Sequence, residues 1–326
     1  MCVFGDSHLP KKNLVDVSYQ IKQNQKGLSL YDIRRQRRTL ERFILTLYLK
    51  AANHWRLFLL RNSHFREWLV CPMNYWRSVE LPIVLKLLSP IRDERILDVG
   101  SPKLLSLFLS FRTRARIFAT DLRDYFLDDF IQFRETFGLY NLKSETCDAR
   151  KMHYLDNTFD KIFSISVIEH IPETGDIDAL REFSRVTKPG GQVVITIPYN
   201  RNSITEYTKE SHYWIKKSDK ASFYQRRYSY SSLKNRLTRP AGFKIKNLYF
   251  IGERPIKKPC IRSDGTFIHN YFFLNQSPSI KFLRKTHIPY LTYLNYRIYS
   301  NLLHYISTDP NDPNVRNVVL DLKKDH

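Results

Sequence analysis

From residue 95 onward, short runs of apolar residues alternate with longer segments in which apolar residues recur at three- and four-residue steps. The short runs predict strands, and the longer segments predict helices. The predicted strands cover residues 95–100, 115–122, 142–149, 159–167, 192–199, 243–253 and 315–324, and the predicted helices between them cover 102–113, 124–138, 176–191 and 228–242. This alternation is typical of βαβ units, so we expect an α/β fold around a parallel sheet with right-handed crossovers.

The chain before this region has a helical pattern and a basic front part. Apolar residues follow helical spacing over 33–60, and a second predicted helix covers 75–90. A long insertion, 253–314, separates the last two predicted strands, and connections of that length usually carry function or pack as a unit. We therefore expect three parts: a helical, basic extension over 1–90, a core over 91–252, and the insertion with the final strand over 253–326.

The composition indicates a folded protein with a strong excess of basic residues. The 42% of hydrophobic and 14% of aromatic residues exclude a disordered chain. Lys and Arg number 53 against 32 Asp and Glu, which gives a formal net charge of +21. Such an excess favours nucleic acid, acidic lipid headgroups or phosphorylated substrates as partners, without choosing among them.

The cysteines and the apolar segments indicate the compartment. Cys2, Cys71, Cys147 and Cys260 lie far apart, so they predict thiols in a reducing cytosol, and neither a zinc signature nor a disulfide framework. The N-terminus has no apolar core of signal-peptide length, and two basic residues interrupt the most apolar early stretch, 42–60. We expect a soluble, cytoplasmic protein, and peripheral contact with a membrane stays open.

Polar residues recur where successive predicted strands end. Asp98, Asp121 and Asp148 stand at the first three strand ends, and Ser166 stands at the fourth. Ligands of an open parallel sheet bind beyond the carboxyl ends of the strands, where these side chains should meet. The first carboxylate can bind an ammonium group, the second can accept hydrogen bonds from both ribose hydroxyls, and the third can accept from the adenine amino group. The series therefore predicts adenosine recognition.

The run from Ile96 to Tyr199 resembles the class I S-adenosylmethionine-dependent methyltransferases, in the group with a type 11-like methyltransferase domain. The phrase SVIEHIP at 166–172 and the segment 180–199 carry this resemblance, and a weaker similarity continues over 228–245. The resemblance implies a doubly wound, Rossmann-like sheet of seven mostly parallel strands, with the last strand antiparallel. It also implies S-adenosyl-L-methionine as cofactor. We expect the N-terminal extension to cover the cofactor side.

The resemblance further implies a set of cofactor-binding residues at the strand ends. They are Asp98, Gly100 and Ser101 at the methionine portion, Asp121 and Leu122 at the ribose, Asp148 and Ala149 at the adenine, and Ser166 on the floor between cofactor and acceptor.

The loop after Gly100 departs from the family's first motif, which usually reads Asp-x-Gly-x-Gly-x-Gly. Here Ser101 is a strong N-cap, Pro102 suits the first helical position, and Lys103 lies in the first turn. The positive end of such a helix would face the site, where a methionyl carboxylate is stabilised. The loop is either a variant that binds cofactor or one retained for the fold alone, and the intact acidic series favours the first interpretation.

His170 is the candidate catalytic residue. It follows the fourth predicted strand, and histidine can serve as a base for an acceptor that must lose a proton. The alternative is a structural histidine. Glu169 and His170 also resemble part of a metal-binding pattern in ubiquinone-biosynthesis O-methyltransferases and small-RNA 2′-O-methyltransferases. Those enzymes carry a further glutamate where this chain has Ser166, so we predict no metal.

A short segment before the sheet offers further candidates. Tyr75, Arg77 and Glu80 are predicted to lie on a helix that covers the cofactor. Arg77 could pair with the methionyl carboxylate, and Tyr75 could face the sulfonium through a cation–π contact. The alternative is a helix that packs on the sheet with no role in binding.

The acceptor is less constrained than the cofactor. Aromatic residues alternate with Lys and Arg over 282–299, and this pattern suits stacking on bases, a flat ring or a lipid interface, or the core face of a helix. No RNA-binding module with a readable signature is present. We expect a small-molecule or lipid-like acceptor. The alternatives are an RNA methyltransferase and a non-catalytic partner protein that kept the fold.

Overall fold

The computed structural model describes residues 28–52, 71–91, 93–100, 104–124, 128–210, 217–255, 278, 281–282 and 291–325. The predictions for Ser101, Pro102 and Lys103 lie outside the described residues, as does most of the insertion between 256 and 290.

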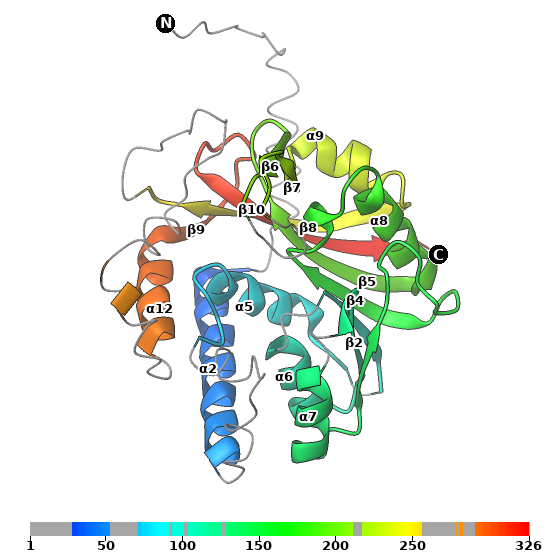
Figure 1. Cartoon of the computed structure of the whole chain (residues 1–326). Coiled ribbons are helices and arrows are strands. Elements are labelled where there is room, and N and C mark those ends of the chain that lie inside the picture. The colour runs from blue at the N-terminus through cyan, green and yellow to red at the C-terminus, as the bar shows by residue number, and fades with distance from the viewer. Residues whose placement is uncertain are drawn as a thin grey trace, which may run out of the picture.

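A single large sheet forms the centre of the molecule, with helices on both of its faces (Figure 1). Its strands are β1 (Arg95–Val99), β2 (Arg116–Asp121), β3 (Leu142–Thr146), β4 (Phe159–Ile165), β5 (Thr187–Pro198), β8 (Phe243–Glu253), β9 (His304–Ser307) and β10 (Val315–Lys324), in the spatial order β3-β2-β1-β4-β5-β10-β8-β9. The first five strands pair in parallel, and β10 pairs antiparallel with β5 and β8. The seven predicted strands and the antiparallel last strand are therefore confirmed, and β9 is an eighth strand from the insertion.

The helices pack in two layers, which makes the sheet doubly wound. One face of the sheet carries α2 (Leu30–Ala52), α5 (Arg77–Leu88), α6 (Leu104–Arg112) and α7 (Asp128–Phe137), and the other carries α8 (Gly175–Val186) and α9 (Tyr230–Ser232), which continues as a π-helix over Leu233–Thr238. Alternation along β1 shows the two faces of the sheet, because Ile96 belongs to one core and Leu97 to the other.

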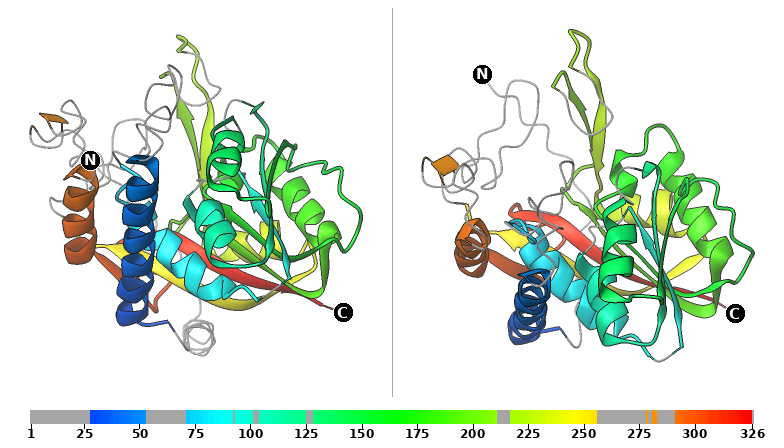
Figure 2. Two further views of the ribbon diagram at one scale, coloured as in Figure 1. Left: turned by 90° about the horizontal axis from the view of Figure 1, so that it is seen from below. Right: turned by 60° about the horizontal axis from the view of Figure 1, so that its bottom comes forward.

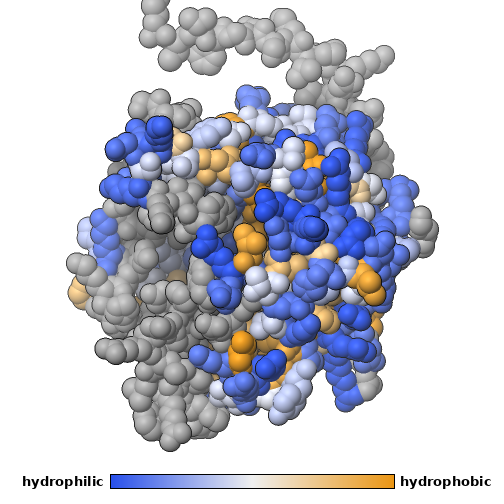
Figure 3. Space-filling view, turned by 45° about the vertical axis from the view of Figure 1, so that its right-hand side comes forward, coloured by the Kyte–Doolittle hydropathy of each residue, from blue (hydrophilic) through white to orange (hydrophobic). Residues whose placement is uncertain are grey.

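The surface of the molecule that is turned forward in Figure 3 is mostly hydrophilic where its residues are described, with hydrophobic residues in small scattered patches.

The helix predicted over 176–191 is shorter than expected. It ends at Val186, and Thr187 already has extended backbone angles as the first residue of β5. Pro189 explains the difference, because proline cannot donate the next helical hydrogen bond and disfavours helical angles at the residue before it. The expectation that the glycine pair at 190–191 ends the helix was wrong by one helical turn.

The sequence pattern did not predict a hairpin that follows β5. Strands β6 (Ile204–Thr208) and β7 (Ser222–Arg227) pair antiparallel and stand out from the body of the molecule (Figure 2). The hairpin contains a buried ion pair, in which Arg227 Nε donates to Glu206 Oε1 at 2.6 Å. The base of the hairpin contacts a short 3₁₀-helix, Ile168–His170, that follows β4.

The insertion packs against the N-terminal helix. Helix α12 (Leu291–Leu303) lies beside α2 in Figures 1 and 2, and the Tyr293 hydroxyl donates to Glu41 Oε1 at 2.6 Å. Tyr293 and Tyr296 are buried, so this part of the aromatic stretch is the core face of a helix. None of the helices in the described part of the chain combines the length and apolar character that crossing a bilayer requires.

Candidate active site

A cavity of about 720 Å³ opens at the carboxyl ends of β1 to β4. Seven of the predicted site residues line it: Gly100, Asp121, Leu122, Asp148, Ala149, Ser166 and His170. They come from four successive strand ends, as a parallel sheet requires of residues that share one site. The fold therefore brings together side chains that lie up to 70 positions apart in the sequence.

Of the two remaining predicted residues, Asp98 is not among the residues that line the cavity. Asp98 is buried at the end of β1, and its carboxylate accepts a hydrogen bond from the Ser106 hydroxyl of α6. Its expected contact with the methionine portion stays a prediction. Ser101 lies outside the described residues.

Gly100 joins the ends of two strands. Its φ of +69° is a conformation that L side chains rarely adopt, and its N–H donates to the Thr120 carbonyl at 2.8 Å. A Cβ atom at this position would lie 2.5 Å from Cγ2 of Val167, far inside van der Waals contact. Glycine is needed here both for the turn and for the close approach of the β4 end.

Asp121 and Leu122 stand at the rim of the cavity, where β2 ends. Asp121 is half-buried, and its Oδ1 accepts a hydrogen bond from the backbone N–H of Arg123 at 3.0 Å. This short turn holds the carboxylate at the cavity. Arg123 also lines the cavity, so the rim carries both signs of charge.

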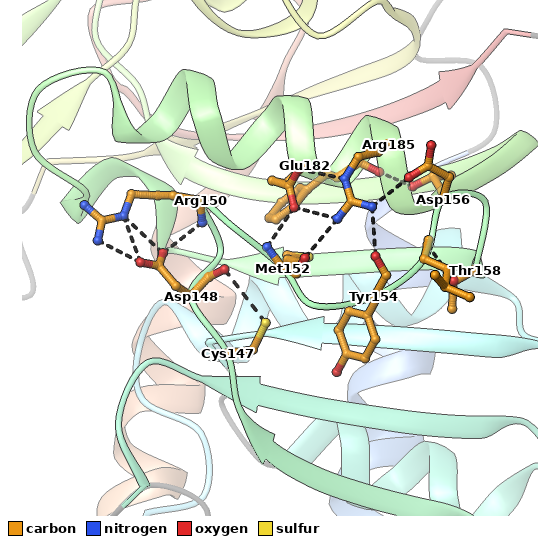
Figure 4. A network of polar contacts seen from close by, with 12 residues as sticks. Cys147, Asp148, Arg150, Met152, Tyr154, Asp156, Thr158, Glu182 and Arg185 are labelled. Carbon is orange, nitrogen blue, oxygen red and sulfur yellow. Dashed lines mark hydrogen bonds and ion pairs between the residues drawn. The ribbon is translucent and has the colours of Figure 1, made fainter.

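Asp148 is held by a neighbour that the sequence reasoning missed. The Arg150 guanidinium donates to both carboxylate oxygens, with Nε 3.0 Å from Oδ1 and Nη2 2.7 Å from Oδ2 (Figure 4). These bonds lower the pKa of the Asp148 carboxyl, which keeps it ionised. The sequence Asp-x-Arg at a strand end could have predicted this ion pair, because side chains two positions apart in a turn can come into contact.

The loop that carries Asp148 is fastened to α8. The Arg185 guanidinium donates to the backbone carbonyls of Met152 and Tyr154, at 3.0 and 2.8 Å, and pairs with Glu182 (Figure 4). Glu182 in turn accepts the Met152 N–H at 2.7 Å. Because its polar backbone groups are satisfied from α8, this loop presents Asp148 from a fixed position.

Arg77 and Ser166 form the junction between α5 and the end of β4. Arg77 Nη1 donates to the Ser166 hydroxyl at 2.9 Å and pairs with Glu80, whose Oε1 also accepts from Asn317 at 2.7 Å. Ser166 has a φ of +52°, an uncommon conformation for a residue with a side chain. Arg77 lines the cavity, as the interpretation of a covering helix expects.

Tyr75 does not face the cavity. Its side chain is fully buried, with its ring centroid 4.3 Å from that of His304 and 5.6 Å from that of Trp76. The expectation of a cation–π contact from Tyr75 was therefore wrong, because α12 and the first residue of β9 enclose the ring.

His170 lines the cavity with a defined tautomer. Its Nδ1 lies 2.8 Å from the backbone carbonyl oxygen of Tyr224 in β7. A carbonyl only accepts, so Nδ1 carries the proton, and the lone pair of the neutral ring is on Nε2. The unpredicted hairpin thus determines which nitrogen of His170 can accept a proton.

Glu169 lies beside His170 and is entirely buried. Neither of its carboxyl oxygens has a hydrogen-bond partner in the described part of the chain, and Oε1 lies 3.9 Å from His170 Nε2. Burial raises the pKa of the carboxyl to about 8, so the group is mostly neutral at pH 7. Within the described ranges, no three His, Cys, Asp or Glu side chains gather in a way that could hold a metal ion.

Comparison with known proteins gives one family and several structural relatives. The profile of a family described as "Methyltransferase domain" matches residues 97–195. The uncharacterized protein YafE of Escherichia coli K12 is 30% identical over 96 residues, which cover 29% of this chain and 45% of that protein. The chain thus matches less than half the length of this curated relative.

Two solved structures resemble the fold at low sequence identity. The [4+2]-cyclase SpnF is 17% identical with a TM-score of 0.47, and the match covers 77% of this chain and 82% of that one. Phosphoethanolamine N-methyltransferase 2 of Haemonchus contortus, solved with S-adenosyl-L-methionine, is also 17% identical with a TM-score of 0.47, covering 76% of this chain and 52% of that one.

Proposed function

We propose that the protein binds S-adenosyl-L-methionine at its strand-end cavity and transfers the methyl group to a small-molecule or lipid-like acceptor, because residues 97–195 match the family described as "Methyltransferase domain". One observation carries the proposal: residues from four successive strand ends, expected to bind the cofactor, line the same cavity. Its volume of about 720 Å³ lies in the ordinary range of ligand pockets.

The donor set fits an adenosine-containing cofactor. Asp121 would accept both ribose hydroxyls, and Asp148, kept ionised by Arg150, would accept the adenine amino group with Ala149 against the ring. Gly100 and Ser166 would line the path of the methionine portion, since both stand at the junction of β1 and β4. When bound, the cofactor supplies a methyl group on a sulfonium, a strong electrophile.

The protein's own part is positioning and proton transfer. In-line displacement at a reactive methyl group depends mainly on how the acceptor is oriented, and such positioning can contribute several kcal/mol. Nε2 of His170 carries the lone pair, so it is suited to take the proton of a hydroxyl or ammonium acceptor. Glu169, buried and mostly neutral, adds little negative charge beside that nitrogen at pH 7.

The acceptor proposal rests on the walls near His170. Ile171 and Pro172, which follow His170 directly, line the cavity, as do Pro72 and Cys71, and such apolar residues suit a compact or lipid-like molecule. Helix α5 contributes Arg77 and Leu81 to the lining. We infer on this ground that the extension over 1–90 covers the cofactor side of the core over 91–252.

Two measurements test the proposal in order. Isothermal titration with S-adenosyl-L-methionine should give saturable heat, and the melting temperature should rise with cofactor; no heat and no shift would support a non-catalytic partner protein. Incubation of cell extract with methyl-labelled cofactor should then give a labelled small molecule or lipid by mass spectrometry. Label recovered only in RNA, in a reaction that falls steeply with salt, would instead favour the RNA methyltransferase.

A further inference from the structure

The side of α2 turned away from the core combines arginines with exposed apolar residues. Along one face of the helix stand Tyr31, Arg34, Arg38, Leu45 and Leu49, spaced at three, four, seven and four residues, so that they share one side. Tyr31 is 70% exposed, Leu45 51% and Leu49 74%. Arg35, Arg42 and Lys50 border this row and are exposed as well. We call these eight residues the α2 outer face.

The arginines of the α2 outer face repel one another. Arg34, Arg38 and Arg42 follow at four-residue steps, and like charges at that spacing destabilise a helix by a few tenths of a kcal/mol per pair. No acidic side chain in the described ranges pairs with any of the three. A helix that keeps such a row in its folded state is suited to a partner that supplies negative charge.

The buried side of the same helix shows the opposite arrangement. Arg37 is 4% exposed, and its guanidinium donates to the Ser78 carbonyl, the Ser300 hydroxyl and Asn301. Asp32 pairs with Lys86 of α5 at 3.3 Å. The polar groups that hold α2 in the fold are thus satisfied within the chain. On the outer face, Lys50 lies over the Phe111 ring of α6, whereas Arg34, Arg38 and Arg42 pair with no acidic side chain in the described ranges.

We propose that the α2 outer face binds the surface of a bilayer that contains anionic lipids. Anionic headgroups would neutralise the arginine row, and Tyr31, Leu45 and Leu49 would enter the boundary between headgroups and acyl chains, as on helices that lie in a membrane interface. A nucleic-acid surface would use the arginines but offers nothing to the exposed leucines. The bilayer therefore accounts for both halves of the face.

This surface stands close to the proposed active site. Helix α2 packs on α5, and α5 lines the cavity through Arg77 and Leu81. Docking through α2 would hold the cavity near the bilayer, with α2 and α5 between the membrane surface and the lining of the cavity. The docking itself needs neither cofactor nor catalysis, so its test is independent of the proposed function.

Sedimentation of the full chain with vesicles tests the proposal. Vesicles of phosphatidylcholine mixed with phosphatidylserine should bind the protein, vesicles of phosphatidylcholine alone should not, and added salt should weaken binding. The variant Arg38→Glu/Arg42→Glu should lose binding by at least roughly 25-fold, because each basic residue near an anionic surface contributes about fivefold. Leu45→Ser/Leu49→Ser, which leaves the charge unchanged, should also weaken binding.

A matched control separates the α2 outer face from net charge. Arg181→Glu/Arg239→Glu changes the charge equally on exposed residues of the opposite layer, and it should bind vesicles like the wild type. Equal losses in both charge variants, or no preference for phosphatidylserine, would overturn the proposal. So would binding of a single-stranded RNA that depends on Arg38 and Arg42 while vesicles are ignored. Melting temperatures check folding, and if the charge variant unfolds, the serine variant decides.

Discussion

The two walls of the cavity are built in different ways. On the wall formed by β2 and β3, the acidic residues accept hydrogen bonds from residues close by in the sequence. Arg123 and Arg150 stand two positions after Asp121 and Asp148. On the wall formed by the end of β4, the partners are distant. Ser166 is held by Arg77, 89 positions away, and the ring of His170 by a carbonyl 54 positions away.

Local partners on one wall and distant partners on the other suggest two different roles, one in binding and one in proton transfer. The first wall is partly exposed and keeps its charge, which suits it to bind the polar end of a ligand that arrives from water. On the second wall Glu169 and His170 are buried, whereas Ser166 and Arg77 are half-buried. The fold determines proton positions there, since Nδ1 of His170 donates and burial raises the pKa of Glu169 to about 8. Changes on the two walls should therefore be distinguishable, with binding affected on one and turnover or pH response on the other.

The largest expected effect is on the second wall. His170→Ala should lower turnover by roughly 100-fold or more, the range of general-base contributions, and should leave the affinity for S-adenosyl-L-methionine unchanged. Turnover from labelled cofactor and isothermal titration measure the two quantities. The control is His153→Ala, a half-exposed histidine outside the cavity lining. Full activity of His170→Ala would assign the ring to packing.

On the first wall, Asp121→Ala should weaken cofactor binding by about 100-fold, because it removes two charge-assisted hydrogen bonds to the ribose. Turnover at saturating cofactor should change much less, and the melting temperature without cofactor should stay near that of the wild type. Isothermal titration measures the affinity, with Asp178→Ala on α8 as the matched control. Unchanged affinity would refute the role of Asp121.

Glu169 offers a test by pH alone. Burial raises its pKa from 4.5 to about 8, so between these values the folded protein holds a proton that the unfolded chain has lost. Stability should therefore fall as pH rises through this window. Glu169→Gln cannot ionise, and above pH 8 it should be more stable than the wild type by about 1–2 kcal/mol, since the buried amide keeps a cost of its own.

Melting temperatures from pH 5 to pH 9 measure this difference. The exposed neighbour Glu173→Gln serves as the control and should follow the wild-type curve. Parallel curves for Glu169→Gln and the wild type would contradict the account of a buried, neutral carboxyl.

The smallest effect is expected at Arg150. Its pair with Asp148 is partly exposed, at 47% and 32% of the side chains, and such pairs contribute no more than about 1 kcal/mol. Arg150→Gln should therefore weaken cofactor binding by less than about fivefold in isothermal titration. A loss as large as that of Asp121→Ala would show that Arg150 contacts the cofactor itself.

The same contrast explains what the sequence could predict. Seven strands and the order of the acidic residues followed from periodicity, because the carboxyl ends of parallel strands meet at one edge whatever the loops do. Asp121 and Asp148 could be named for that reason, and Gly100 from the family resemblance. Arg150 was within reach of the same reasoning, since it stands two residues after a named aspartate.

The second wall could not be predicted in this way. The hairpin strands β6 and β7 carry a buried ion pair, Glu206 with Arg227, where a half-buried strand normally shows apolar residues. No local signal links Tyr224 to His170, or Asn317 to Glu80, because those pairings exist only after the sheet has formed. Tyr75 was misassigned for the same reason, since α12 and His304 of β9, which bury it, lie more than 200 positions away.

The most direct measurement is a crystal structure of the protein grown with S-adenosylhomocysteine. We expect the ribose hydroxyls within hydrogen-bond distance of Asp121, the adenine beside Asp148, and the sulfur directed toward the space in front of His170. A cavity without ligand at saturating concentration, or a ligand bound away from these strand ends, would contradict the assignment and leave the domain with its fold but without this cofactor site.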